Sequence, residues 1–135
     1  MSDLLKLSVP GKPEYVRVAR MAAAAFASSL GFDIEAVEDI RLAVGEACNN
    51  VVRYNNDIDY EVHLEAEGDA LVIVVKDKGK GYDVDGYVEP DLSGEGVEGG
   101  LGLFIIKEIM DEVDIRSEIG VGTHITMKKL LARSA

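Results

Sequence analysis

The chain has 135 residues, 47% of them hydrophobic, and this suits one domain over residues 1–135 with a substantial core. The formal net charge of −11 argues against direct nucleic-acid binding, which depends on Lys and Arg at the phosphates. One cysteine excludes an internal disulfide, and no apolar stretch approaches about 20 residues, so we expect a cytoplasmic protein without a membrane segment.

The first half of the sequence predicts one strand and two helices. Residues 5–10 alternate loosely and predict a short edge strand. A helix follows and ends at Gly31, and a second helix begins after the N-cap Asp33 and ends near Tyr54. The apolar stripe expected on the first helix comprises Tyr15, Val18, Ala19, Ala22, Phe26 and Leu30. The one expected on the second comprises Val37, Ile40, Ala43, Val44, Ala47 and Val51.

The second half predicts a hairpin, a glycine-rich loop, a helix and two more strands. Residues 60–66 alternate, Gly68-Asp69 is a turn, and residues 71–75 are typical of a fully covered central strand. A helix over 101–110 and strands from Val113 and from Thr123 to Leu130 follow. This order predicts an α+β fold, a two-layer sandwich in which a mixed, mostly antiparallel sheet carries its helices on one face.

The stretch from Asp77 to Gly102 contains eight of the 14 glycines. Glycine lets the backbone approach a ligand closely. Glycine clusters at both ends of the stretch indicate a loop that closes over a ligand. The helix that begins at Gly100-Leu-Gly offers free N–H groups, which attract phosphate. We therefore expect a nucleotide pocket with a mobile lid.

Three polar residues of the second helix, Glu46, Asn50 and Arg53, share one stripe because they are four and three residues apart. The stripe is either a solvated face or a site in which the Asn50 carbonyl binds Mg²⁺ and the Glu46 carboxylate accepts a proton. Asp77 ends a buried strand; it either forms a turn or accepts a hydrogen bond from a ligand amine, supported by the Thr123 hydroxyl.

Other motifs carry no chemistry. The G-x-G-x-x-G match at residues 94–99 lacks the preceding strand that the dinucleotide fingerprint requires. His63, His124 and Cys48 have no metal-ligand spacing.

Four segments, in this order, resemble the boxes of the Bergerat (GHKL) ATP-binding fold. They are Glu46-Ala-Cys-Asn-Asn50, Asp77-x-Gly79-x-Gly81, Gly99-Gly-Leu-Gly102 and Gly122-Thr123. Gyrase-type ATPases, sensor histidine kinases and anti-sigma-factor serine kinases share this fold. The compact length and the segment Gly99-Gly-Leu-Gly-Leu-Phe-Ile-Ile106 look most like the RsbW-type serine kinases that bind sigma factors.

The resemblance implies a role for each matching residue. Glu46 is expected to be the general base, Asn50 the Mg²⁺ ligand, and Asp77, with Thr123, the partner of adenine. Arg53 is a candidate phosphate contact, since a basic residue and Tyr follow the Asn in histidine kinases. The expected phosphate-wrapping residues are Gly79, Gly81, Gly99, Gly100, Leu101 and Gly102. The implied cofactors are ATP and Mg²⁺. The implied partners are a sigma factor, a STAS-type anti-anti-sigma protein whose serine is phosphorylated, and a second copy in a homodimer.

The lid is acidic. No Lys or Arg lies between Gly81 and Lys107, and six carboxylates do: Asp83, Asp85, Glu89, Asp91, Glu95 and Glu98. Cations near the transferring phosphate normally stabilise it, so we expect inefficient transfer. Two alternatives follow: a nucleotide-gated binding module without kinase activity, and, from Arg53-Tyr54, a detached histidine-kinase-like ATPase domain.

Overall fold

The computed structural model describes residues 3–55, 57–79, 101–118 and 120–131. The elements follow in the order β1 (Leu4–Val9), a short 3₁₀ helix (Pro13–Tyr15), α1 (Val16–Ser29), α2 (Ile34–Tyr54), β2 (Tyr60–Glu67), β3 (Ala70–Asp77), α3 (Leu101–Ile109), β4 (Glu112–Glu118) and β5 (Gly122–Leu130). The order of strands and main helices is the predicted one. Among the helices of these residues, none combines the length and apolarity that crossing a membrane requires.

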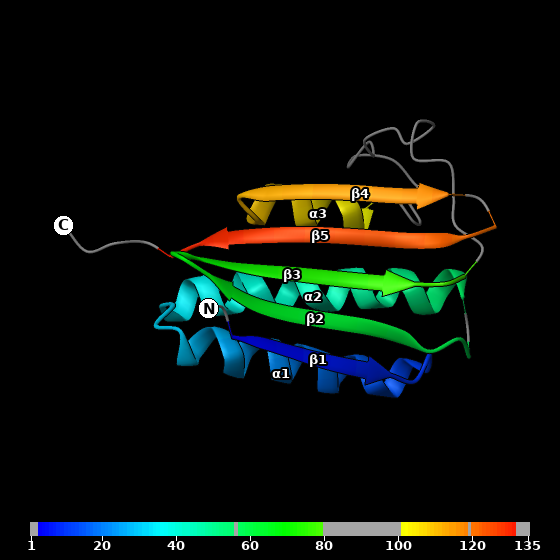
Figure 1. The fold of residues 1–135 in the computed structure, drawn as a ribbon, viewed down its shortest axis with the longest axis horizontal. Helices are drawn as coiled ribbons and strands as arrows, with labels where there is room; N and C mark the ends of the chain where they lie inside the picture. Colours follow the sequence, from blue (N-terminus) through cyan, green and yellow to red (C-terminus); the bar gives the residue numbers. More distant parts are fainter. Residues whose placement is uncertain (1–2, 56, 80–100, 119, 132–135) are drawn as a thin grey trace.

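The sheet has five strands in the spatial order β1-β2-β3-β5-β4 (Figure 1). The sequence predicts a mixed, mostly antiparallel sheet, and all four neighbouring pairs are antiparallel. The reason is the position of β5, which pairs with β3 on one side and β4 on the other. The chain passes through α3 between β3 and β4, and such a crossover joins strands that run the same way. Because β5 separates them, they form no parallel pair.

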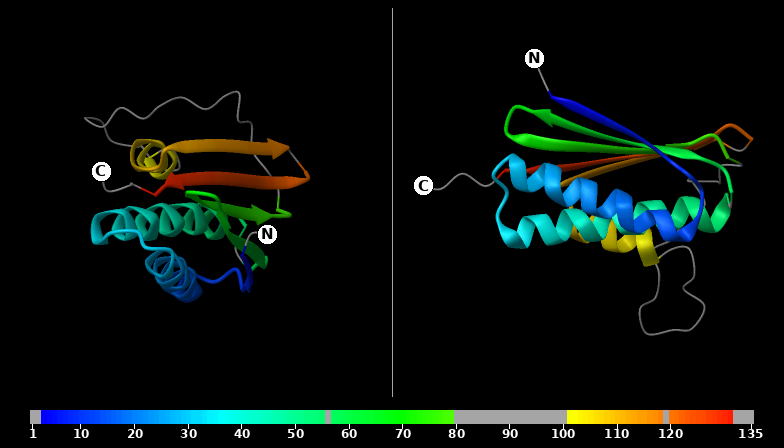
Figure 2. Two further views of the ribbon diagram at one scale, coloured as in Figure 1. Left: turned by 60° about the vertical axis from the view of Figure 1, so that its left-hand side comes forward. Right: turned by 90° about the horizontal axis from the view of Figure 1, so that it is seen from below.

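The three helices lie on one face of this sheet, as predicted, and the other face is open (Figure 2). β3 occupies the expected central position, but only alternate residues of it are covered. Leu71, Ile73 and Val75 are buried, whereas Val72 and Val74 are half-buried on the open face. The prediction of a fully covered strand was therefore wrong. Antiparallel sheets commonly keep one solvated face, and a run of apolar residues does not reveal which side is covered.

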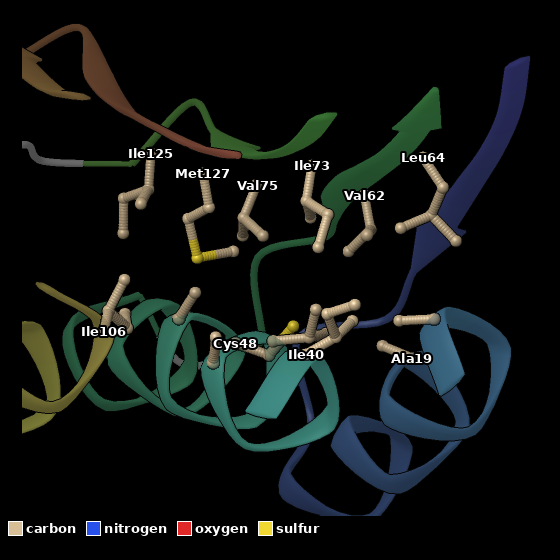
Figure 3. Close-up of a cluster of buried hydrophobic side chains, with 14 of the residues drawn as sticks. Ala19, Ile40, Cys48, Val62, Leu64, Ile73, Val75, Ile106, Ile125 and Met127 are labelled. Atoms are coloured by element: carbon tan, nitrogen blue, oxygen red, sulfur yellow. The ribbon is translucent and has the colours of Figure 1, made fainter. Parts of the chain in front are cut away.

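The core fills the space between the sheet and the helices (Figure 3). Side chains of the inner sheet face, such as Ile73 and Met127, lie opposite Ile40 and Cys48 of α2 and Ile106 of α3. The Asp33 carboxylate caps α2 by accepting a 2.8 Å hydrogen bond from the Ala36 N–H. The residues predicted to face inward from α2 are buried, with Val37 only partly so.

The buried stripe of α1 differs from the predicted one. Tyr15 precedes the helix and is exposed, and Val18 is 57% exposed. The buried residues are Val16, Ala19, Ala23, Ala24 and Ala27. Four of these five are alanines, which let α1 pack closely against its neighbours. The prediction was wrong at Tyr15 and Val18, whereas Phe26 and Leu30 of the predicted stripe are partly buried against the core.

Gly122 begins β5 at a point where two backbones almost touch. Its φ is +137°, a conformation that favours glycine. A Cβ atom at this position would collide with the Asp77 carbonyl oxygen. The close approach of the start of β5 to the end of β3 thus depends on the missing side chain.

We expect Gly122→Ala to lower the free energy of unfolding by about 1–3 kcal/mol more than Gly120→Ala does. Both glycines have positive φ, but a Cβ at Gly120 meets nothing within 4 Å, so the difference reports the collision at Gly122 together with its less tolerated φ. Urea denaturation of the two variants and the wild type measures this difference. Equal losses would contradict the close approach.

Candidate nucleotide-binding site

The predicted adenine partners, Asp77 and Thr123, lie side by side at one end of the sheet. Asp77 is the last residue of β3 and Thr123 the second of β5, and the antiparallel register pairs them directly. The same register pairs Asp77 with Tyr60 of β2. In Figure 1 the end of β3, the start of β5 and the C-terminal end of α2 all lie at the right-hand end.

The Asp77 carboxylate is buried and accepts hydrogen bonds from uncharged donors. The residue is 5% exposed, and among the described residues no Lys or Arg forms an ion pair with it. Its Oδ1 accepts a 2.8 Å hydrogen bond from the Gly79 N–H. Burial raises the pKa of this carboxyl above its ordinary value, while hydrogen bonds from the backbone of Gly79 and Thr123 oppose the shift. A buried carboxylate with spare acceptor capacity suits a ligand that brings an N–H donor.

Thr123 is buried and belongs to a second polar pair. Its Oγ1 lies 2.8 Å from the Ser117 Oγ of β4, close enough for a hydrogen bond in which either hydroxyl donates. Ser117 also donates to the Gly122 carbonyl at 3.4 Å. Sequence reasoning missed Ser117. The register of the Val113 and Thr123 strands around the Gly120-Val-Gly122 turn could have indicated it, since that register places Ser117 opposite Thr123.

Asn55 is the other site residue that sequence reasoning missed. The sequence Asn55-Asn56-Asp57 is typical of a turn, yet the Asn55 side chain is buried, with 6% of the residue exposed. The Asn55 Nδ2 donates a 3.3 Å hydrogen bond to Asp77 Oδ1. Turn-forming Asn is ordinary. The one sequence feature that could have marked Asn55 as a site residue is its position just beyond the helix end, five residues after Asn50.

Glu46 and Asn50 are half-buried on α2, and Arg53 is exposed in its last turn. Glu46 lies against the first turn of α3, because a Cβ added to Gly102 would be 3.0 Å from Glu46 Oε2. The structure thus brings together two segments that are 56 positions apart in the chain, the predicted base and one of the predicted phosphate-wrapping glycines. Leu101, at the start of α3, is exposed.

Cys48, two residues from both Glu46 and Asn50 and therefore on the opposite face of α2, belongs to the core. The thiol is fully buried beside Tyr60, and burial raises the pKa of Cys48 to about 12. A thiol that stays protonated at neutral pH is neither a nucleophile nor a metal ligand. Its role is packing, as predicted.

Comparisons with known proteins agree with this geometry. A family model described as a histidine kinase-like ATPase domain matches residues 9–129. The serine-protein kinase RsbW of Bacillus pumilus is 34% identical over an alignment covering 97% of this chain and 88% of that protein. The RsbW of Oceanobacillus iheyensis is 36% identical, with 96% and 88% covered.

The chain belongs to the RsbW family of serine-protein kinases. A crystal structure of the RsbU and RsbW domains of a Mycobacterium tuberculosis protein has the same fold, with a TM-score of 0.74 at 20% identity. It matches 98% of this chain, which spans 34% of that longer protein.

Several residues predicted from the RsbW resemblance lie outside the described residues, namely Gly81, Gly99 and Gly100, together with the remainder of the lid. Of the other predicted residues, Asp77, Gly79 and Thr123 form one cluster, and Glu46 and Gly102 another. Their roles in binding and catalysis stay predictions.

The described residues also fit the expected magnesium. They contain no group of three His, Cys, Asp or Glu that could form an all-protein metal cage. Mg²⁺ needs no such cage, because it keeps several waters and takes one or two protein oxygens together with substrate phosphates. The Asn50 carbonyl, half-buried one turn from Glu46, is the oxygen that would hold it.

We expect the stability of Asp77→Asn relative to wild type to depend on pH. Burial raises the pKa of the Asp77 carboxyl in the folded chain above its value of about 3.8 in the unfolded one. Ionisation therefore costs the folded state, and wild type loses stability relative to the variant as pH rises from about 4 through the raised pKa. Urea unfolding of both proteins between pH 4 and 7.5 measures the change. A difference independent of pH would contradict the shift.

Proposed function

We propose that this RsbW-family protein is an ATP-dependent anti-sigma factor. It sequesters a sigma factor and phosphorylates a serine of a STAS-type anti-anti-sigma protein in the cytoplasm. The observation that carries the proposal is the contact between Glu46 and Gly102, which brings the predicted base to the predicted phosphate-binding helix start. The buried acceptor Asp77 lies at the end of the sheet toward which α2 runs.

Adenine recognition follows from the donors and acceptors at Asp77. The 6-amino group of adenine donates, and the Asp77 carboxylate retains acceptor capacity after its bonds to Gly79, Asn55 and the Thr123 backbone. Guanine presents a carbonyl oxygen at the same position, which the carboxylate would repel. The site therefore favours adenine nucleotides.

Phosphate transfer requires a base and stabilisation of charge. The substrate serine oxygen attacks the γ-phosphorus, its proton passes to the Glu46 carboxylate, and ADP leaves. The backbone N–H groups at the start of α3, with Gly102, point to where anionic oxygens are stabilised. The Asn50 side-chain carbonyl would hold a magnesium ion, which would neutralise part of the phosphate charge. Arg53 and Lys78 are exposed cations near the ends of α2 and β3 that can contribute in place of lid cations.

The protein partners need a surface away from this pocket. Val18 and Met21 are each 57% exposed on α1, and Arg17 is exposed beside them. Exposed apolar side chains next to a cation suit an acidic, partly apolar protein surface. We infer that α1 contributes to partner binding. Homodimer formation remains an expectation from the family resemblance.

Two alternatives differ in their chemistry. A nucleotide-gated binding module is favoured by the acidic lid and would hold its partner in ATP without transferring phosphate. A histidine-kinase-like domain gains less support. Both histidines of this sequence lie on strands, and His63 is engaged with Glu61 at 2.9 Å.

We expect Glu46→Gln to bind Mg-ATP with unchanged affinity and to transfer phosphate about 10²- to 10⁴-fold more slowly. The amide keeps the size of the carboxylate but cannot accept the serine proton. Calorimetry measures the binding, and radiolabelled ATP with a cognate anti-anti-sigma protein measures the transfer.

Glu35→Gln, in the exposed first turn of the same helix, is the matched control and should retain transfer. Transfer by Glu46→Gln at the wild-type rate would remove Glu46 from its role. Capture of the partner by wild type in ATP, with no phosphorylated product, would instead favour the binding module.

A further inference from the structure

Asn55 is held in place from both sides by its own backbone. It follows the last residue of α2, and its N–H donates to the Val51 carbonyl at 2.8 Å, which continues the helical bonding by one residue. Its carbonyl accepts from the Ile58 N–H at 3.1 Å in the connection to β2. The side chain therefore leaves α2 in a fixed direction, toward the end of β3.

That side chain occupies the space beside Gly79. A Cβ atom added to Gly79 would collide with the Asn55 Oδ1. The Asn55 Nδ2 reaches Asp77 Oδ1 at 3.3 Å, and the Gly79 N–H reaches the same oxygen at 2.8 Å. The end of α2, the end of β3 and the first glycine after β3 thus meet at one carboxylate oxygen.

The two donors leave the Asp77 oxygens unequal. Oδ1 accepts from both Asn55 and Gly79, and the Thr123 backbone donates a third hydrogen bond to the carboxylate, so Oδ2 still keeps the larger acceptor capacity. Asn55 donates without a charge. A Lys or Arg in its place would also fix the carboxylate, but it would neutralise the group and weaken its attraction for an incoming N–H. A neutral amide orients the carboxylate without neutralising it, so its full negative charge can attract the N–H group of the ligand.

We propose that Asn55 is a positioning residue that directs Asp77 Oδ2 toward the purine amino group and so sets the preference for adenine. The inference rests on the proposed function, because it assumes that Asp77 binds the base. It assigns to the end of α2 a part in nucleotide selection, separate from the expected roles of Glu46 and Asn50 in phosphate chemistry.

The test compares ATP with purine riboside 5′-triphosphate, which lacks the 6-amino group, by calorimetry in magnesium. We expect wild type to prefer ATP by about 10- to 100-fold. Asn55→Ala should reduce this preference by about 3- to 10-fold, mainly through weaker binding of ATP. Asn55→Asp, which keeps the side-chain shape but replaces the donor with an oxygen, should reduce it further. Asp77→Asn should nearly abolish the preference for ATP, and adding Asn55→Ala to that variant should have no further effect on the preference.

Asp33→Ala is the matched control, because it removes the cap at the opposite end of the same helix. It should lower thermal stability without changing the preference for ATP. If Asn55→Ala and Asn55→Asp weaken both nucleotides by the same factor, Asn55 is merely structural and the inference is overturned. Equal wild-type affinity for the two nucleotides overturns it as well. Wild type that binds neither nucleotide contradicts the proposed function itself.

Discussion

The antiparallel pairing of β3 with β5 is the constraint on which the site depends. It places Asp77 opposite Thr123 and continues through β4 to Ser117. Side chains alternate between the two faces of a strand, so a slip of one residue would move Asp77 to the open face. The apolar residues before it, such as Val75 and Ile73, hold the register because they would be exposed by the same slip. The core that stabilises the sheet therefore also aligns the site.

Burial of the Asp77 carboxylate, in a chain of net charge −11, is electrostatically unfavourable for the folded state. The hydrogen-bond donors at Asp77 are neutral, namely the Gly79 N–H, the Asn55 amide and the Thr123 backbone, and burial outweighs both these bonds and the charge of His124, so the pKa of the carboxyl is raised. Unpaired buried charge generally destabilises the folded state. Its retention makes physical sense when a ligand supplies the missing donor, and binding energy and folding energy then act on the same group.

The features that could be predicted from the sequence are those that depend on local pattern. The inward face of α2, the hairpin at Gly68 and the adjacency of Asp77 and Thr123 follow from periodicity, turn chemistry and register. Features that depend on packing between distant segments could not be predicted. Which face of α1 is buried depends on the packing of its alanines against α2 and the sheet. The partial exposure of Val72 and Val74 depends on which side of the sheet the helices cover. Asn55 looks like a turn residue until the end of β3 is placed beside it.

Because Cys48 is buried, the reactivity of its thiol reports how often the core of the folded chain opens. The sulfur is the only one in the chain that can become a thiolate, and it is sealed in the core next to Tyr60 with a pKa of about 12. Attack by a disulfide reagent requires both solvent entry and loss of the proton, so Cys48 of the native molecule is inert to such reagents at the surface. The rate of labelling reports how often α2 separates from the sheet, and any molecule that stabilises the closed state slows that labelling without touching the sulfur.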